Sequence, residues 1–266
     1  MLTNPYSLGC KKDPRDLRDI PMGLVLPAIP VPKSLDYASS MTPVRDQGDE
    51  GTCVAFAGVV GVKEYQDSKE YKKPLKLSPR YAYSLCKKFD GIPNEEGTYP
   101  RAAMKVFLNY GVCPEAFWPY KPYQKDRPKQ GADKSALKYK IKAYARLKTL
   151  LDMKRSLLVN GPFLAGVEVY ESWFSQKAGK TGIIPMPKPS EELQGGHAIC
   201  IVGYDDDKGL FKFKNSWGAK WGAKGYGALP YEYMKKYSSD AWSGTDLIEN
   251  PKALVKKREE TLQKFT

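Results

Sequence analysis

RDQGDEGTCVAFAG, residues 45–58, changes from a polar, glycine-containing loop to an apolar run around a single cysteine. From Cys53 onward the apolar residues recur at helical spacing, which predicts a helix that packs into the core. Thr52 is the expected N-cap, so Cys53 falls in the first helical turn. A helix N-terminus and nearby cations both lower the pKa of a thiol, and the thiolate is a strong nucleophile. The stretch therefore leads to the hypothesis that Cys53 is reactive.

A reactive thiol that cleaves an amide needs a group that takes a proton and later returns it. The chain contains one histidine, His197, in the stretch GGHAIC. Asn215, in FKNSWG, could hold the other ring nitrogen through its side-chain oxygen, and Trp217 could cover that hydrogen bond. Gln47 lies shortly before the cysteine, and its amide could join the Cys53 backbone N–H as an oxyanion donor.

The two halves of the chain differ in their predicted secondary structure. Up to about residue 125 the patterns are helical, with Ser78 as an N-cap before Pro79 and with Gly111 closing a later helix. The second half contains β-rich runs, including QGGHAICIVGYDDDKGLFKFKN, in which Gly209 belongs to a hairpin turn. A helical lobe followed by a sheet lobe predicts an α+β fold with a cleft between the lobes.

Composition indicates a globular chain with a basic surface. The 43 basic and 30 acidic residues give a net charge of +13, which attracts acidic partners such as nucleic acid or anionic membranes. The lysines are scattered, however, and the chain shows no nucleic-acid-binding motif, so we expect a solvated surface without a specific nucleic-acid partner. No apolar run approaches the length of a membrane span, and no signal peptide is visible. A signal removed earlier would leave the same sequence, so the compartment stays open.

The five cysteines do not predict a disulfide framework, because their number is odd and their spacing irregular. With no CxxC pair and one histidine, the sequence predicts no metal site and no other cofactor.

Three stretches, PVRDQGDEGTCVAFA, GGHAICIVGYDD and KNSWGAKWGAKGYG, resemble papain-like cysteine peptidases in content and order. The separations between Cys53, His197 and Asn215 are close to those of that family. The resemblance covers about residues 34–243 and implies a two-lobed fold. A helical left lobe (about 50–125) would face an antiparallel β-sheet or barrel right lobe (about 126–243) across the active-site cleft. It implies Cys53 as nucleophile, His197 as general acid and base, Asn215 as orienting residue and Gln47 as oxyanion donor.

The resemblance also implies where a substrate binds. EEGTYPRAA stands where the family has a glycine pair that hydrogen-bonds the substrate backbone, and there Thr98 replaces the second glycine. Its backbone can still pair with an added strand. A small residue at Gly166 would leave room for a bulky apolar or aromatic side chain. The implied substrate-binding residues are Gly97, Thr98, Tyr99, Pro100, Gly166, Gly196, Ala198 and Trp217.

Several features depart from the family pattern. Glu50 stands where the family has a disulfide-bonded cysteine, and Val54 stands where it has a tryptophan. A missing disulfide fits a reducing compartment or a branch that is stabilised otherwise. GVCPEAFWPY and GCKKDPRDLRD resemble a bacterial-type branch that lacks the long inhibitory prosegment.

The two ends of the chain lie outside the expected peptidase domain. Residues 1–33 form a proline-rich extension that is too short for the family's helical prodomain. This arm either crosses or borders the cleft and limits access, or is a surface strap that adds only stability. Residues 244–266 have a helical pattern and would form a C-terminal tail.

The predicted function is hydrolysis of peptides or proteins through a thiolate–imidazolium pair and an acyl-enzyme. One histidine leaves no second one to grip a terminal carboxylate, which favours an endopeptidase. Two alternatives remain open: an acyl-transferase or peptide ligase that uses the same thioester chemistry, and a catalytically silent binding module.

Overall fold

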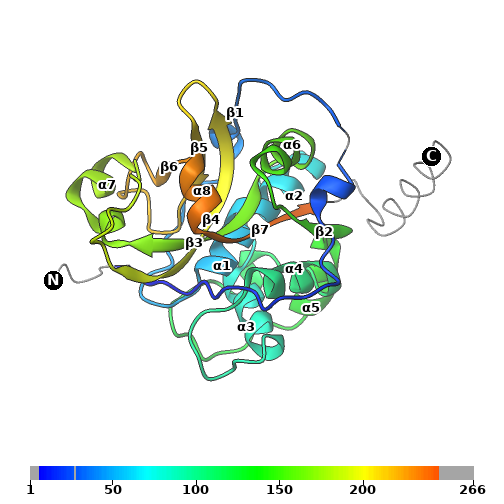
Figure 1. The fold of residues 1–266 in the computed structure, drawn as a ribbon. Coiled ribbons are helices and arrows are strands. Elements are labelled where there is room, and N and C mark those ends of the chain that lie inside the picture. The colour runs from blue at the N-terminus through cyan, green and yellow to red at the C-terminus, as the bar shows by residue number, and fades with distance from the viewer. Residues whose placement is uncertain (1–5, 27, 246–266) are drawn as a thin grey trace.

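The computed structural model describes residues 6–26 and 28–245 (Figure 1). A continuous helical stretch begins at Cys53 and passes through a π-helical segment, Ala57–Lys63. The helices of this side of the molecule are α1 (Cys53–Phe56), α2 (Glu64–Glu70), α3 (Pro79–Phe89), α4 (Pro100–Asn109) and α5 (Ala132–Ala136). The helical pattern read from residue 53 onward is therefore present.

Two predicted helix starts have different outcomes. Ser78 caps α3, because its hydroxyl accepts a hydrogen bond from the Tyr81 backbone N–H at 3.1 Å. Thr52 stands at the N-cap position of α1 but makes no side-chain cap. Its hydroxyl instead lies 2.8 Å from the hydroxyl of Tyr120. The expectation of a side-chain cap from Thr52 is wrong, because a partly buried tyrosine from a distant segment takes the hydroxyl.

In the described residues, seven strands form an antiparallel sheet in the order β2–β7–β3–β4–β5–β6, with β1 paired to β4. The strands are β1 (Ser34–Asp36), β2 (Ala143–Arg146), β3 (Phe163–Tyr170), β4 (Leu193–Asp205), β5 (Leu210–Lys214), β6 (Tyr226–Pro230) and β7 (Ser238–Thr245). The predicted hairpin joins β4 to β5, and Gly209 takes a positive φ of 64° in its turn. Helices α6 (Leu150–Asn160), α7 (Gln176–Thr181) and α8 (Tyr231–Tyr237) lie on the sheet side.

Hydrophobic side chains pack into two clusters, one on each face of the sheet. Alternation along β4 assigns Cys200 to the cluster shared with the helices and Ile201 to the other cluster. Gly61 packs so closely on the sheet that a Cβ there would lie 2.5 Å from the Cys200 Cβ. The close contact of helix and sheet explains why a glycine stands inside this helix. The fold is α+β, as predicted.

The boundaries of the two lobes differ in detail from the expected ones. Ala132 and Ala136 of α5 pack in the helical cluster, beyond the expected boundary at about residue 125. Gly244 and Thr245 end β7, and the rest of the expected helical tail lies outside the described residues. In residues 6–26 and 28–245, no helix is long and apolar enough to span a membrane.

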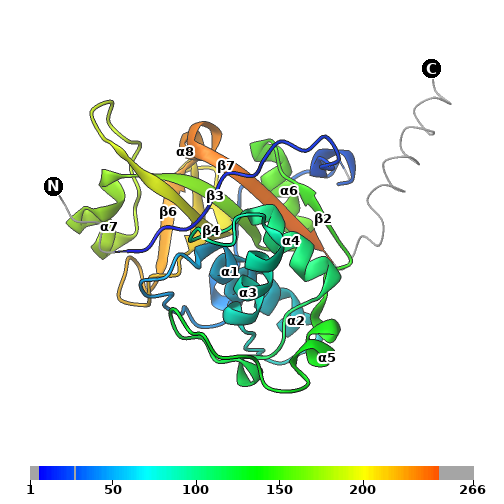
Figure 2. The ribbon, with the colours of Figure 1, turned by 90° about the horizontal axis from the view of Figure 1, so that it is seen from below.

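The N-terminal arm crosses the face on which α1 and α4 meet the strands β3, β4 and β7 (Figure 2). It then turns into the sheet side, where Met22 and Leu26 join the second hydrophobic cluster. The arm is therefore anchored at its far end by ordinary core packing.

Candidate active site

Cys53 lies at the first residue of α1 and is completely buried. Burial raises the pKa of its thiol to about 11, because a thiolate is poorly solvated there. Hydrogen bonds from the backbone of Ala198 and Gly9 oppose that shift. The thiol is thus enclosed between strand β4, which carries Ala198, and the N-terminal arm, which carries Gly9.

His197 lies one residue before Ala198 in β4 and is also completely buried. Its Nε2 is 2.8 Å from the side-chain oxygen of Asn215, which follows β5. That oxygen also accepts the Ser216 backbone N–H at 2.8 Å, which fixes the orientation of the amide. The acceptor opposite Nε2 assigns the proton of a neutral ring to Nε2, so Nδ1 is left as the base. Nδ1 is buried and makes no hydrogen bond to any described residue.

Burial lowers the pKa of His197 to about 4, although the hydrogen bond to Asn215 opposes the shift. A raised thiol pKa and a lowered imidazole pKa both favour the uncharged forms. With the cleft filled as in this structure, burial therefore opposes formation of a thiolate–imidazolium pair.

Tryptophan rings enclose the histidine. Trp217 stacks on His197 with ring centroids 4.5 Å apart and an interplanar angle of 26°. Trp173 approaches edge-on at 6.2 Å and is completely buried. The sequence predicts Trp217 over this hydrogen bond but gives no sign of Trp173. The stretch ESWF that contains Trp173 carries no motif, and only the fold brings it to the histidine.

Gln47 is buried and its side-chain amide is held at both ends. The oxygen accepts from the Ser216 hydroxyl at 2.6 Å. The Nε2 donates to the Glu50 carbonyl at 3.0 Å and to the carbonyl of Ser7, in the arm, at 3.3 Å. The amide nitrogen of Gln47 therefore donates one hydrogen bond within its own loop and one to a carbonyl oxygen of the arm.

The arm pairs through its backbone with the stretch that the sequence predicts to bind substrate. Cys10 forms a parallel bridge with Thr98. The Thr98 N–H donates to the Gly9 carbonyl at 2.9 Å, and the Lys11 N–H donates to the Thr98 carbonyl at 3.0 Å. The Cys10 N–H donates to the Gly196 carbonyl at 3.0 Å. Residues that were expected to bind substrate thus bind the chain's own arm.

The other expected binding residues surround the same segment. A Cβ at Gly166 would lie 2.8 Å from the Cys10 sulfur and 3.6 Å from Pro100, so these residues share one pocket. A Cβ at Gly97 would lie 2.2 Å from the Gly9 carbonyl oxygen, which requires a glycine there. Tyr99 lines a cavity of about 370 Å³ beside the arm.

The arm also contacts the ring that covers His197. The ring of Tyr6 stacks on Trp217 at 4.4 Å with an interplanar angle of 7°. Cys10, which the sequence left as a thiol of unknown role, is buried. All five cysteines are free.

Glu50, which stands where the family has a cysteine, is buried and paired with Arg80 of α3. Two hydrogen bonds join the guanidinium to the carboxylate, one of them at 3.0 Å. The carboxylate also accepts the Tyr123 backbone N–H at 2.8 Å. An ion pair therefore links the cysteine loop to α3 at the position where the resemblance gives the family a disulfide.

The sequence profile of the papain family of cysteine proteases matches residues 31–240. The chain belongs to this family. A peptidase C1-like protein of Acanthamoeba polyphaga mimivirus is 35% identical over 213 residues, which cover 74% of this chain and 68% of that protein. Cathepsin K of Mus musculus is 30% identical over 205 residues, 75% of this chain and 60% of that protein.

Solved structures of this family share the fold. Xylellain, a cysteine protease from Xylella fastidiosa, superposes with a TM-score of 0.79 at 30% identity. The superposition covers 91% of this chain and 96% of xylellain. The described chain is therefore a papain-family cysteine protease with a papain-like fold.

Proposed function

We propose that this chain is an active cysteine peptidase in which Cys53, His197, Asn215 and Gln47 carry out the chemistry. The observation that carries the proposal is the arrangement around His197. The side-chain oxygen of Asn215 lies 2.8 Å from Nε2, and Nδ1 makes no hydrogen bond to any described residue. The next residue of the same strand, Ala198, hydrogen-bonds the Cys53 thiol through its backbone. A base with one nitrogen held and the other free is what activation of a thiol requires.

The proposed reaction uses the two nitrogens in different roles. Nδ1 of His197 takes the proton of Cys53 as the sulfur bonds to the substrate carbonyl carbon. The Gln47 amide and the Cys53 backbone N–H stabilise the resulting oxyanion. The tetrahedral intermediate collapses, the C–N bond breaks, and His197 returns the proton to the leaving amine. Water then attacks the thioester with His197 as base, and the released thiol regains its proton.

A substrate would take the hydrogen bonds that the arm now makes. Thr98 offers its backbone N–H and carbonyl and Gly196 offers its carbonyl, so an extended peptide can add as a strand. The pocket beside Gly166 and Pro100, which now contains the Cys10 side chain, would take a substrate side chain, with Ala198 deeper in the site.

The arm favours an endopeptidase. It passes Cys53 on both sides, reaching Trp217 through Tyr6 and Thr98 through Cys10. A site that can bind chain on both sides of the cysteine does not require the cleaved bond to lie near an end of the substrate. This supports internal cleavage over removal of terminal residues.

We further propose that the arm blocks the cleft and that the enzyme is latent in this state. The arm escapes cleavage because Gly9 presents a backbone hydrogen bond to the thiol instead of a carbonyl carbon. The Gly9 carbonyl oxygen accepts the Thr98 N–H and is therefore not at the oxyanion donors. The alternative, a strap that adds only stability, does not require the arm to fill the site. The likeness to xylellain, from Xylella fastidiosa, supports a bacterial-type branch.

A digest of a peptide library, read by mass spectrometry, tests this function. We expect internal cuts that disappear in Cys53→Ala, with the activity increasing when the arm is loosened. A folded, arm-loosened enzyme that cuts no peptide would contradict the proposal. Products longer than the added peptides would show a ligase instead.

A further inference from the structure

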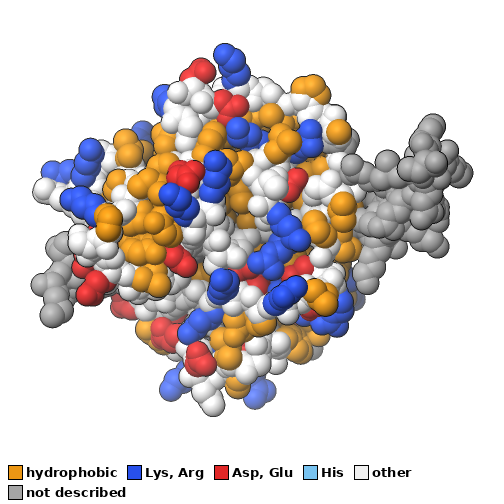
Figure 3. Space-filling model, in the orientation of Figure 1, with side chains coloured by type: hydrophobic (Ala, Val, Ile, Leu, Met, Phe, Trp, Pro, Cys, Tyr) orange, Lys and Arg blue, Asp and Glu red, His pale blue; other side chains and the backbone are white. Residues whose placement is uncertain are grey.

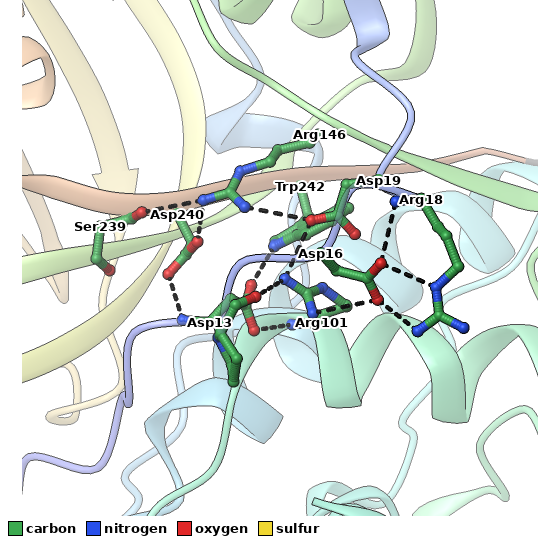
Figure 4. Close-up of polar contacts among 10 residues, drawn as sticks. Asp13, Asp16, Arg18, Asp19, Arg101, Arg146, Ser239, Asp240 and Trp242 are labelled. Atoms are coloured by element: carbon green, nitrogen blue, oxygen red, sulfur yellow. Dashed lines mark hydrogen bonds and ion pairs between the residues drawn. The ribbon is translucent and has the colours of Figure 1, made fainter.

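The arm continues from the cleft into a set of buried ionic contacts (Figure 4). Asp13 is 6% exposed, and both of its carboxylate oxygens are used. One accepts the Arg101 backbone N–H at 3.0 Å, and the other accepts the indole N–H of Trp242 at 2.7 Å. The Asp13 backbone N–H donates to Asp240 at 2.9 Å.

Two more aspartates of the arm follow at the same spacing along the chain. Asp19 lies 3.0 Å from one guanidinium nitrogen of Arg101 and 3.3 Å from one of Arg146. Asp16 lies 3.8 Å from Arg101. Both guanidiniums lie over the ring of Trp242, at 5.7 and 5.6 Å from a ring centroid. Two carboxylates of the arm thus face the guanidiniums, and the third, Asp13, accepts the Arg101 backbone N–H and the Trp242 indole N–H.

Arg101 depends on the arm for its partners. It is 7% exposed, and within residues 6–26 and 28–245 its side-chain hydrogen bond and ion pairs go to Pro14, Asp16 and Asp19. Arg146, in contrast, also pairs with Asp240 of the body. The arm itself encloses Arg101, and a covering segment without carboxylates would bury this cation with no compensating anion, which is costly. The site therefore selects for a segment that carries carboxylates.

We propose that Arg101, Arg146 and Trp242 form an anchor site for an extended acidic segment, that Asp13, Asp16 and Asp19 of the arm are its ligand, and that this binding holds the cleft closed. The proposal rests on the proposed function of the cleft and specifies how that site is regulated.

The anchor site acts on the cleft through the short chain between Cys10 and Asp13. The contacts of residues 9–11 in the cleft are mainly backbone hydrogen bonds, which contribute modestly to stability. Charge-assisted hydrogen bonds in the anchor site are about twice as strong as neutral ones. While the anchor site is filled, the neighbouring residues stay at high effective concentration over the cysteine. Loss of the anchor site should therefore open the cleft.

Alkylation of cysteines in the full-length chain tests the proposal. Cys10 is buried only while the arm is docked, whereas Cys86 is buried in α3 and reports unfolding of the body. The test compares Asp13→Asn and Asp19→Asn with wild type and with Asp207→Asn, an exposed turn position. Iodoacetamide labelling is mapped by peptide mass spectrometry.

We expect Cys10 to be labelled about tenfold faster in Asp13→Asn, because an amide offers one acceptor oxygen where the Arg101 N–H and the Trp242 N–H use two. This effect comes from a lost hydrogen bond and not from the charge of Asp13. Asp19→Asn removes the charge that pairs with Arg101 and Arg146, and there we expect several-fold faster labelling, with the rate at Cys86 unchanged in both variants. Tenfold corresponds to about 1.4 kcal/mol. Wild-type rates at Cys10 in both variants would overturn the anchor site. Parallel acceleration at Cys10 and Cys86 in both variants would also overturn it, because the aspartates would then support the whole fold.

Peptide hydrolysis measured on the same samples separates this inference from the proposed function. Faster labelling of Cys10 together with faster hydrolysis supports both. Faster labelling without hydrolysis leaves the anchor site in place and contradicts the peptidase function.

Discussion

At the scale of single residues, the state of the site depends on how His197 and Cys53 are solvated. Both side chains are completely buried beneath the arm, and burial opposes the charge on each. Asn215 still holds the imidazole by one nitrogen. We therefore expect an ordered but uncharged pair in the closed state, with charge separation following when the arm leaves.

The protonation of His197 can be observed directly, because it is the one histidine of the chain. Its pKa is lowered from about 6.5 to about 4, so the unfolded chain binds the proton more readily. The stability contributed by the neutral ring is complete above pH 6.5 and is lost as the pH falls through 4. That loss amounts to about 3 kcal/mol of the free energy of unfolding. In proton NMR the imidazole signal should keep its neutral position down to about pH 5. A transition near or above pH 6.5 in the closed enzyme would be inconsistent with this account.

The site positions that the sequence predicts are those carried by motifs, and the roles of these residues stay predictions. Cys53, His197, Asn215 and Gln47 each stand in a recognisable stretch, and the fold gathers them around one cleft. Trp173 and the partners of Glu50 could not be predicted, because nothing local marks them. Their positions depend on contacts between elements far apart in sequence.

At the scale of elements, the loop before α1 is held by the buried pair of Glu50 and Arg80. A buried ion pair is no general source of stability, but removal of one partner leaves the other charge uncompensated. The bond from the Tyr123 N–H to Glu50 extends the link to a third segment.

Replacement of Arg80 by methionine should lower the free energy of unfolding by about 3–5 kcal/mol, because Glu50 would stay buried and unpaired. Lys208→Met breaks an exposed ion pair with Asp205 and should change the free energy of unfolding by less than about 1 kcal/mol. Urea denaturation of both variants measures the difference. Equal effects from the two substitutions would show that the Glu50 pair does not support the loop.

The docking of the arm should depend on pH through Asp13. Burial, and then the nearby Asp240, raise the pKa of Asp13 from 3.8 to about 7 in the docked state. A released arm would have the ordinary value, so docking is strongest at low pH and weakens as the pH rises towards 7. Asp13 contacts Arg101 of α4 and Asp240 and Trp242 of β7. The other charged groups of the same cluster are Arg146 of β2 and Asp16 and Asp19 of the arm. Arg18 holds the pKa of Asp16 below its usual range, so that residue stays ionised.

Between pH 5 and pH 8 the protection of the Cys10 and Lys11 amides from hydrogen exchange should fall at least tenfold. Protection factors remove the intrinsic dependence of exchange on pH, and the Cys86 amide in α3 is the control. Constant or rising protection of the arm amides over this range would contradict a raised Asp13 pKa.

At the scale of the whole molecule, a helical first half and a β-rich second half could be read from the sequence, whereas helices α6, α7 and α8 of the second half could not. The sequence left two paths open for the arm, and the contacts that fix its path could not be predicted. The repeat of Asp13, Asp16 and Asp19 along the arm is visible in the sequence. Its meaning depends on Asp240 and Trp242, more than two hundred residues away. The contact between Gln47 and Ser216 likewise joins distant segments.

The distribution of charge over the molecule is consistent with a basic but unfocused surface. On the face shown in Figure 3, lysine and arginine side chains lie among acidic and apolar ones. Arg101 of the anchor site does not belong to this basic surface, because the arm encloses its guanidinium. Attraction of acidic partners by the net charge of +13 should therefore be general and weaken with salt.

The central claim is that Cys53 forms a thioester with its substrate, and trapping that intermediate tests it most directly. The Asp13→Asn chain is mixed with an activated peptide ester, quenched in acid within a turnover, and measured by intact and peptide-mapped mass spectrometry. The account predicts an adduct on Cys53 with the mass of the acyl group. The adduct should be absent from the double variant that carries both Asp13→Asn and Cys53→Ala. Hydrolysis without such an adduct, or an adduct that persists in Cys53→Ala, would contradict it.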